Sequence, residues 1–478
     1  MNETGANLKS AAKVSIIAMA VLLAGAFYFF KERILFIDAA HICFRLLNYK
    51  TFVIEEHRYG SFITQMVPLI GLRLHVSLKA ILIAYSVSFN LFYFIVAILL
   101  VYRYRQYGMA ILMALYYTLF VSDAYFWTNN EVHQGTAWMF LFLAVAFYNA
   151  GKHRPLFLQL LAFILLAVLA VFTHPLVMIS VLFLWGYLYI NKEQWPFGRL
   201  ETVGFSLLLL VIAGLKFYVS QSPGYDSGKM EQAIHMNLDS IWQALKSPMT
   251  KKFFHDCIYN YWLVILITIA GIGTLSLQRK WLLLCWTLLA ALSFYILMGL
   301  TYGYSLYDRH TQFYMESEWM SLSIILAAPF VFNLLPSLKQ QSATWLLFFI
   351  FIVRFIYIGK SAPLFTERIS FVEQGLQQMR KKGLTKVVLV KENSEIEDKL
   401  LMDWGLPDES LMTSVIDGDR PALTYTQLPA DQLTKGVPKD AQTMIACFQL
   451  VKEKLNTSYF PIDTSRPYVI MSYETFYK

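Results

Sequence analysis

Hydrophobic residues along the chain gather in long runs that short polar segments separate. The runs cover residues 14–30, 78–101, 109–121, 136–149, 156–172, 176–190, 203–218, 259–275, 281–300, 319–335 and 345–358. A helix needs ~17 to 25 apolar residues to cross a bilayer, and the runs approach or reach that length. The pattern therefore predicts a mainly α, polytopic membrane helix bundle of about eleven spans.

The stretch after the last run, residues 359–478, has a different pattern. Residues 367–382 have helical periodicity, residues 386–391 (KVVLVK) and 468–472 are typical of short strands, and residues 394–402 are again helical. We expect a membrane domain over residues 1–358, including an external loop at 31–77, and a small α/β domain over residues 359–478.

Composition agrees with a membrane protein. Of 478 residues, 57% are hydrophobic and 15% charged, whereas globular domains are about a quarter charged. The net charge of +8 comes from short Lys and Arg clusters between apolar runs, a topology signal that gives no support to nucleic-acid binding. The four cysteines form no close pair, so the sequence indicates neither a zinc motif nor a disulfide framework.

The basic clusters also predict sidedness. They fall in every second connection, at residues 103–105, 152–154, 192–199, 279–280 and 339, and mark these connections as cytoplasmic. The alternate connections and the carboxyl-terminal domain are then extracytoplasmic. We expect an integral protein of the plasma or inner membrane.

The external loop 31–77 is unusually rich in charge. If a helix begins near Asp38, then Asp38, His41 and Arg45 share one face at positions i, i+3 and i+7. Glu55 and the run Glu56, His57 and Arg58 follow. The alternative is structural, with Asp38 capping the helix and the other groups solvated at the membrane surface.

The other external connections carry further ionisable or polar groups. They are Glu131, His174 before Pro175, and the group Tyr304, Asp308, Arg309 and His310. Ionisable groups at span ends on one side predict a shared polar cavity. Local alternatives are a capping box from Thr128 to Glu131, a helix start at Pro175 and an interfacial anchor at residues 308–310.

One more external segment, residues 220–258, has apolar residues at helical spacing. They are Met230, Ile234, Leu238, Ile241, Trp242 and Leu245. The spacing predicts an amphipathic helix in the membrane interface, which either flanks a lateral entrance for a lipid chain or simply covers the bundle.

The order of these features resembles the GT-C superfamily of glycosyltransferases, including the protein O-mannosyltransferases and the aminoarabinose transferase of lipid A. Asp38 matches the catalytic carboxylate of the family's first external loop. Residues 56–60 (EHRYG) are similar to the Glu-Lys-Pro-Pro segment of that loop. Residues 166–177 (LAVLAVFTHPLV) resemble the family's span with a Lys-Gly-Pro break, with His174 in the place of Lys-Gly. The resemblance covers residues 13–358.

This resemblance implies inverting transfer of a sugar from a polyprenyl-phosphate donor to an extracytoplasmic glycan, lipid or protein acceptor, in a role in the cell envelope. Asp38 would be the general base, because a carboxylate accepts the acceptor's proton. Glu55, Glu56 and Glu131 would position the acceptor or, with Asp38, hold a divalent metal ion. The remaining candidates would bind substrate, and most can donate to the leaving phosphate: His41, His57, Arg58, His174, Tyr304, Asp308, Arg309 and His310.

Two other classes of protein fit the same sequence. One is a transporter or flippase for a lipid-linked sugar, and the other is a non-catalytic subunit of an envelope glycan assembly complex. The sugar, the carrier lipid, the acceptor and any dependence on metal stay open at the level of sequence.

Overall fold

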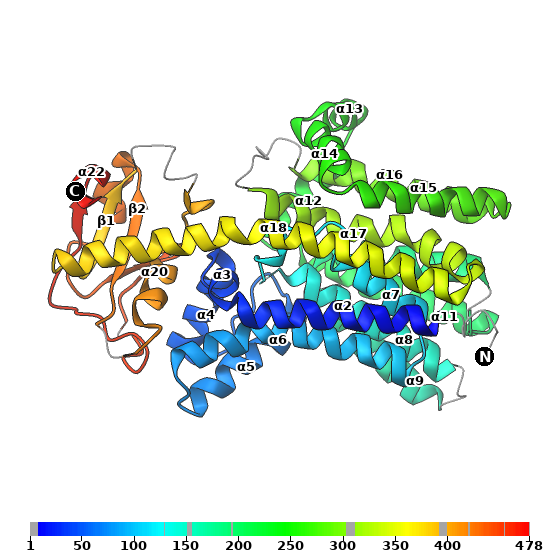
Figure 1. Cartoon of the computed structure of the whole chain (residues 1–478), viewed down its shortest axis with the longest axis horizontal. Coiled ribbons are helices and arrows are strands. Elements are labelled where there is room, and N and C mark those ends of the chain that lie inside the picture. The colour runs from blue at the N-terminus through cyan, green and yellow to red at the C-terminus, as the bar shows by residue number, and fades with distance from the viewer. Residues whose placement is uncertain are drawn as a thin grey trace.

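The computed structural model describes residues 8–477, except 129, 151–154, 193–194, 303–310, 392–398, 419–420 and 454. A bundle of long helices and a smaller domain with strands lie end to end (Figure 1). The amino terminus lies at the far end of the bundle, and the carboxyl terminus lies in the smaller domain.

Every predicted apolar run lies mainly within a helix. The corresponding helices are α2 (Lys9–Tyr28), α6 (Leu78–Ile98), α7 (Tyr107–Tyr116), α8 (Glu131–Ala150), α9 (Leu156–Thr173), α10 (Pro175–Asn191), α11 (Arg199–Val219), α15 (Trp262–Leu277), α16 (Trp281–Tyr302), α17 (Gln312–Pro329) and α18 (Gln340–Lys381). Among the described residues, seven helices are long and apolar enough to cross a membrane, or eight if α14 (Pro248–Tyr259) and α15, bent by 87°, form one span. The mainly helical bundle is confirmed, its long apolar helices are compatible with a multi-pass membrane protein, and a count of eleven spans stays a prediction.

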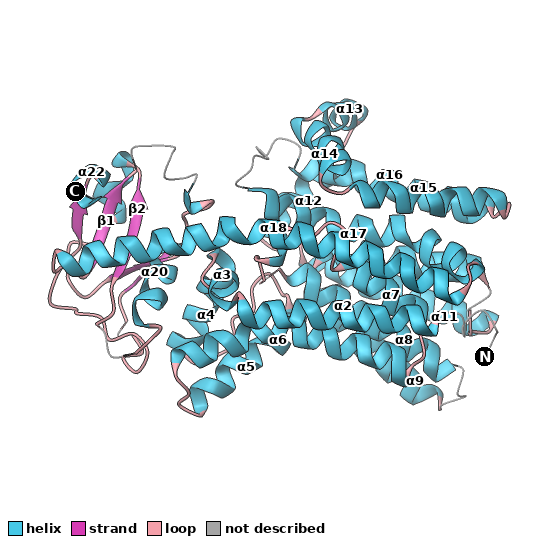
Figure 2. Ribbon diagram, in the orientation of Figure 1, coloured by secondary structure: helices cyan, strands magenta, loops and turns pink. Residues whose placement is uncertain are grey.

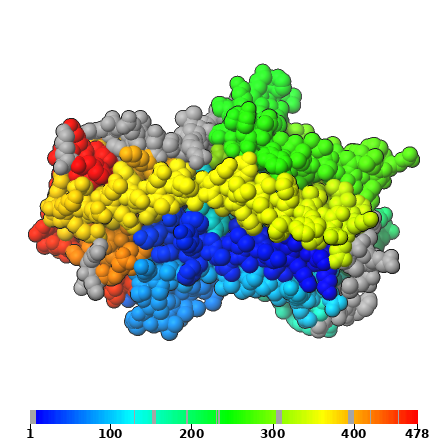
Figure 3. Space-filling model, viewed as in Figure 1, coloured from blue at the N-terminus to red at the C-terminus, as the bar shows by residue number. Residues whose placement is uncertain are grey.

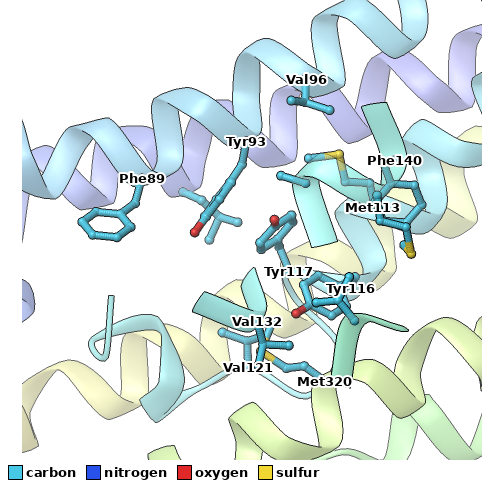
Figure 4. Close-up of a cluster of buried hydrophobic side chains, with 14 of the residues drawn as sticks. Phe89, Tyr93, Val96, Met113, Tyr116, Tyr117, Val121, Val132, Phe140 and Met320 are labelled. Atoms are coloured by element: carbon cyan, nitrogen blue, oxygen red, sulfur yellow. The ribbon is translucent and has the colours of Figure 1, made fainter. Parts of the chain in front are cut away.

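The centre of the bundle is formed by helices that are buried almost all round. Helix α7 has ten residues, is apolar and has only Gly108 partly exposed. A helix that is apolar all round is buried, so other helices of the bundle surround α7. Figure 4 shows the surrounding cluster, in which Tyr93 of α6 and Tyr117, just after α7, stack with ring centroids 4.4 Å apart. Aromatic stacking of this kind adds to the burial of apolar area.

Helix α18 joins the two parts of the molecule. Its 42 residues span roughly 60 Å at ~1.5 Å per residue, about twice the thickness of a bilayer's hydrocarbon core. The helix crosses the visible face of the bundle and continues into the smaller domain (Figure 3). The domain boundary predicted at residue 359 therefore lies inside one continuous helix, whose end confirms the helix predicted at 367–382.

The smaller domain contains a parallel sheet of three strands (Figure 2). Strand β1 (Lys386–Val390) lies between β2 (Thr424–Leu428) and β5 (Val469–Met471). These strands confirm the predictions at 386–391 and 468–472, whereas the helix predicted at 394–402 lies mostly outside the described residues. The other elements are α20 (Leu406–Val415), η7 (Ala430–Gln432), α21 (Leu433–Gly436), the hairpin of β3 (Met444–Ala446) and β4 (Gln449–Val451), and α22 (Tyr473–Tyr477).

Two connections fold into short helices. The segment after α2 forms α3 (Phe30–Ile34), α4 (Ile37–Tyr49), η1 (Tyr59–Ser61) and α5 (Phe62–Arg73), and α4 is the helix predicted near Asp38. The segment at 220–258 forms α12 (Tyr225–Ile234), α13 (Leu238–Lys246) and α14, so one continuous amphipathic helix was a wrong prediction. The reason is local capping, because Asn237 accepts a hydrogen bond from the Ser240 N–H and Ser247-Pro248 starts a new helix.

Three buried arginines fix the connections around these helices. Arg33 donates to Ser86, Asn90 and the carbonyl of Tyr125. Arg354 of α18 donates to three carbonyls, those of Thr118, Val121 and Asn260. Arg368 of α18 donates to Glu409 and to the carbonyls of Leu35 and Leu400. Because buried carbonyls need partners, each guanidinium stabilises one arrangement of the connecting segments.

Candidate active site

A cavity of about 850 Å³ lies between the helical bundle and the smaller domain. We call it the polar cavity. Six of the residues singled out in the sequence line it: Asp38, Glu55, Glu56, Arg58, Glu131 and His174. Other polar or aromatic lining residues are Trp127, Tyr225, Tyr302, Tyr314 and Glu318, and the smaller domain contributes Met402, Trp404 and Phe448. Segments far apart in the chain thus converge on one cavity.

Asp38 lies in the first turn of α4. The N-cap residue is Phe36, in extended conformation, so the capping interpretation of Asp38 was wrong. Oδ2 of Asp38 instead accepts a hydrogen bond from Nε1 of Trp127 at 2.8 Å. Burial, with Glu131 close by, raises the pKa of Asp38 to about 6. A carboxylate with such a pKa is a better proton acceptor near neutral pH than an ordinary aspartate.

The smaller domain fixes the residue that precedes Asp38. Ile37 has a φ of +33°, which is unusual for a β-branched residue. Its N–H donates to Oε1 of Glu409 at 2.6 Å, and a Cβ at Gly405 would lie 2.7 Å from its Cα. Backbone strain of this kind persists only where surrounding contacts hold it, and it clusters at functional sites.

Arg58 forms a forked ion pair. Its guanidinium donates to Oε2 of Glu131 and to Oδ1 of Asp226, each at 2.8 Å. Nζ of Lys216 lies 3.9 Å from the carboxylate of Asp226 and donates to the carbonyl of Glu56 at 3.1 Å. Lys216, Asp226, Arg58 and Glu131 therefore form a chain of alternating charge, which we call the charge chain.

Glu131 begins α8, but not as part of a capping box. The side chain of Thr128 donates to the carbonyl of Arg33, and Oδ1 of Asn130 accepts from the N–H of Val132. The predicted capping box was wrong, because Glu131 is drawn to Arg58 across the cavity.

His174 occupies the break between α9 and α10. It is the extended N-cap of α10, with Nδ1 accepting from the N–H of Leu176 at 3.2 Å, and Pro175 starts the helix as predicted. Burial, together with Arg58 and Lys216, holds the pKa of His174 well below its ordinary value, which favours a neutral imidazole. Gly60 of η1 allows a close approach to the end of α9, because a Cβ there would lie 1.8 Å from Oγ1 of Thr173.

The other predicted site residues have separate outcomes. Glu56 accepts from the N–H of Tyr225 at 2.8 Å, and Glu55 pairs with Arg45. His41 is buried beside Asp408, and His57 is bonded to Tyr59, so neither lines the polar cavity. Asp38, His41 and Arg45 share a helix but have different partners. Tyr304, Asp308, Arg309 and His310 lie outside the described residues.

A second cavity of about 540 Å³ adjoins the first. We call it the apolar groove, and it lies among α10, α11, α12, α13 and α16. Its apolar lining includes Met178, Ile179, Phe217, Ile234, Ile241, Ile296, Leu297, Met298 and Leu300. His174, Leu176, Tyr225 and Tyr302 line both cavities, and the charge chain runs from Lys216 and Asp226 in the groove to Arg58 and Glu131 in the polar cavity.

Several lining residues were not predicted from the sequence. Lys216 could have been predicted, since a lysine inside an apolar run is a signal of function. Trp404 and Phe448 had no such signal. Their rings stack at 4.7 Å, and Phe448 is 79% exposed with a φ of +60° at the tip of the β3–β4 hairpin.

The carboxylates of the polar cavity do not gather as a metal site. In the described part of the chain, the one group of three His, Cys, Asp or Glu ligands within 4.8 Å is His41, Asp408 and Cys447. Asp38 and Glu131 are instead bonded to Trp127 and Arg58. The arrangement can accept a proton, hold a negative group and take up an apolar chain.

No family model, curated protein or solved structure matches this chain.

Proposed function

We propose that this protein is a membrane glycosyltransferase that moves a sugar from a polyprenyl-phosphate donor to an extracytoplasmic glycan, lipid or protein acceptor, with inversion. The observation that carries the proposal is the junction of the polar cavity with the apolar groove across the charge chain. The three parts of such a donor match these three features: its apolar chain matches the groove, its phosphate the charge chain, and its sugar the polar cavity.

The donor's binding mode follows from this junction. The isoprenoid chain lies in the apolar groove, where it is removed from water. The phosphate lies near Arg58 and Lys216, whose donors suit phosphate oxygens, and the sugar extends into the polar cavity.

Asp38 is the general base in this proposal. It takes the proton of an acceptor hydroxyl as that oxygen forms a bond to the anomeric carbon. The bond from this carbon to the phosphate oxygen breaks, and the polyprenyl phosphate leaves with the electron pair. Arg58 and Lys216 stabilise the charge that develops on the leaving group. Arg309 and His310 stay candidates for the same task from the sequence.

The acceptor enters from the side of the smaller domain. Trp404 and Phe448 form that wall of the polar cavity, and the broad apolar face of an aromatic ring suits the packing of a sugar ring. We place this side, and the smaller domain, outside the cytoplasm, because of the alternating basic connections. A reporter after Lys478 should then lie on the opposite side of the membrane from one at Gln106.

The test is transfer of sugar by purified protein in liposomes, with lipid extracts as donor source. Asp38→Asn keeps an oxygen for the Trp127 hydrogen bond but cannot accept the proton, so transfer should fall by roughly 10²- to 10⁴-fold. Asp417→Asn is the matched control, since Asp417 forms an exposed pair with Lys79 away from the cavity. A well-folded Asp38→Asn protein with full activity would contradict the proposal.

A lipid-linked sugar transporter or flippase is the second candidate, because it would also need a groove and a polar cavity that communicate. In that case labelled donor would cross the liposome membrane and no sugar would be transferred. Donor binding with neither transfer nor transport would favour the non-catalytic subunit.

A further inference from the structure

Three potential metal ligands meet where α4 contacts the smaller domain. They are His41 of α4, Asp408 in the first turn of α20 and Cys447 in the turn of the β3–β4 hairpin. All three are buried, with exposed fractions of 6%, 0% and 1%. One ligand atom from each lies within 4.8 Å of the others.

The distances suit a small tetrahedral site. Nδ1 of His41 lies 3.1 Å from Oδ2 of Asp408. Zinc bonds of about 2.0 Å to nitrogen or oxygen and about 2.3 Å to sulfur place neighbouring ligand atoms roughly 3.3 to 3.5 Å apart in a tetrahedral site with one sulfur. The ligand atoms of His41 and Asp408 already lie close to this spacing, and no two of the three ligand atoms are more than 4.8 Å apart.

A second observation points to a ligand at this position. Oδ1 of Asp408 is buried and has no hydrogen-bond partner of standard geometry among the described residues. A buried carboxylate oxygen without a well-formed hydrogen bond is unfavourable, and a cation would satisfy it. Cys447 also interacts with this carboxylate through its thiol and its backbone N–H, and zinc binding replaces the proton of such a thiol.

We propose that His41, Asp408 and Cys447 bind a divalent transition-metal ion of the zinc type. Imidazole nitrogen and thiolate sulfur favour zinc, whereas calcium and magnesium prefer sites built from oxygen alone. Three protein ligands leave the fourth tetrahedral position for water. This site is separate from the carboxylates of the polar cavity, and it does not depend on the proposed transferase activity.

The ion ties three elements together at the wall of the polar cavity. The ring of His41 lies edge-on to Trp404 and Phe448, with centroids 6.4 and 5.9 Å away. Cys447 and Phe448 form the two-residue turn of the hairpin, so a bond from the ion to the thiolate also fixes Phe448 in its left-handed conformation. The ion therefore positions this wall of the cavity and acts as a structural clamp.

The first experiment measures metal content by mass spectrometry after the purification tag has been removed. We expect one zinc per chain in the parent, and loss of that zinc in Cys447→Ala and Asp408→Asn. Cys257→Ala is the matched control, because Cys257 is also buried but lies in α14, outside the cluster. In cobalt-substituted protein, a thiolate-to-cobalt charge-transfer band should appear in the parent and vanish in Cys447→Ser.

Either of two results for metal content would overturn the proposal. One is a parent protein that contains no stoichiometric metal and takes up none from added zinc. The other is equal metal content in the parent and in Cys447→Ala, which would mean adventitious binding elsewhere.

A further measurement keeps all three ligands and therefore tests the proposal even if the ligand variants fail to fold. In a chain whose other three cysteines are alanine, a strong chelator should make Cys447 reactive toward a maleimide, and added zinc should restore protection. Protection that a chelator leaves unchanged would also overturn the proposal.

Discussion

Nε1 of Trp127 donates a hydrogen bond to Oδ2 of Asp38 across 2.8 Å, although 89 positions separate the two residues. The indole is itself held against α17, with ring centroids 5.1 Å from Phe313 and 5.3 Å from Tyr314. The carboxylate that we assign as general base is thus oriented by the bundle, while the start of its helix is held by Glu409 of the smaller domain.

The pKa of Asp38 predicts the pH dependence of transfer. The rate should rise with pH, have an acid limb near the pKa of about 6, and then level off, because only the carboxylate form accepts a proton. Glu131→Gln removes a negative charge that raises this pKa, so the limb should move to lower pH. Trp127→Phe removes a hydrogen bond that lowers it, so the limb should move to higher pH.

Opposite shifts in the two variants are hard to produce by general damage to the fold. If both variants move the limb in the same direction, or if neither moves it, Asp38 is not the group that titrates in catalysis. The rates are measured in liposomes across the pH range in which each variant stays folded.

The same pKa predicts how Asp38 contributes to stability. The folded value of about 6 lies above the ordinary value of 3.8, so the folded chain retains a proton that the unfolded chain has lost. Its stabilising contribution is complete below about pH 4 and is lost as pH rises through about 6. Asp38→Asn should remove this part of the pH dependence of unfolding in detergent. An unchanged slope between these pH values would contradict the raised pKa.

Arg58 should be important for stability as well as for the donor. Arg58→Ala leaves the carboxylate of Glu131 without its partner and that of Asp226 with only Lys216, 3.9 Å away. Breaking a buried ion pair costs about 3 kcal/mol or more. Denaturant unfolding in detergent measures this loss. The control is Arg45→Ala, whose pair with Glu55 is more exposed and should cost less than about 1 kcal/mol. Similar losses in the two variants would show that the charge chain is not a special element of the fold.

The apolar groove should discriminate donors by the length of their lipid. Ile179→Trp adds bulk to the groove and should raise the KM for a long-chain polyprenyl donor far more than for a short-chain analogue. Ile269→Trp is the control, because Ile269 is exposed on α15 and does not line the groove. Equal effects on both donors would mean that the lipid chain lies elsewhere.

Two substitutions of Phe448 distinguish the cost of its backbone strain from the contribution of its ring to acceptor binding. Phe448→Ala and Phe448→Gly both remove the ring from the cavity wall, but only glycine relieves the left-handed conformation, which costs an ordinary residue ~1 kcal/mol. The glycine variant should thus be more stable than the alanine variant by about 1 kcal/mol, while both show the same increase in the KM for acceptor. An acceptor KM equal to that of the parent would exclude Phe448 from acceptor binding.

The sequence alone predicts more of the fold than of the site. Apolar runs and breaks give helices from local information, so residues 14–30, the break at His174 and the strand at residues 386–391 were predictable. Spans were harder to count, because helices such as α7 are short and buried all round, and hydropathy does not separate burial in protein from burial in lipid. The boundary at residue 359 rested on a change of composition that α18 crosses without a break.

Among site residues, the sequence indicated Asp38, Arg58, Glu131 and His174. Ionisable groups beside membrane spans cost free energy, so their presence there is a signal of function. The sequence paired Asp38 and Glu131 with the wrong neighbours, because capping was the nearest local explanation. Contacts between distant residues decided the outcome, as in the bonds from Arg58 to Glu131 and Asp226. The cluster of His41, Asp408 and Cys447 joins residues up to 406 positions apart, beyond any spacing rule. Local sequence set which segments became helices, and packing of the smaller domain against the bundle set which side chains meet, because burial makes each polar group take the partner that tertiary structure offers.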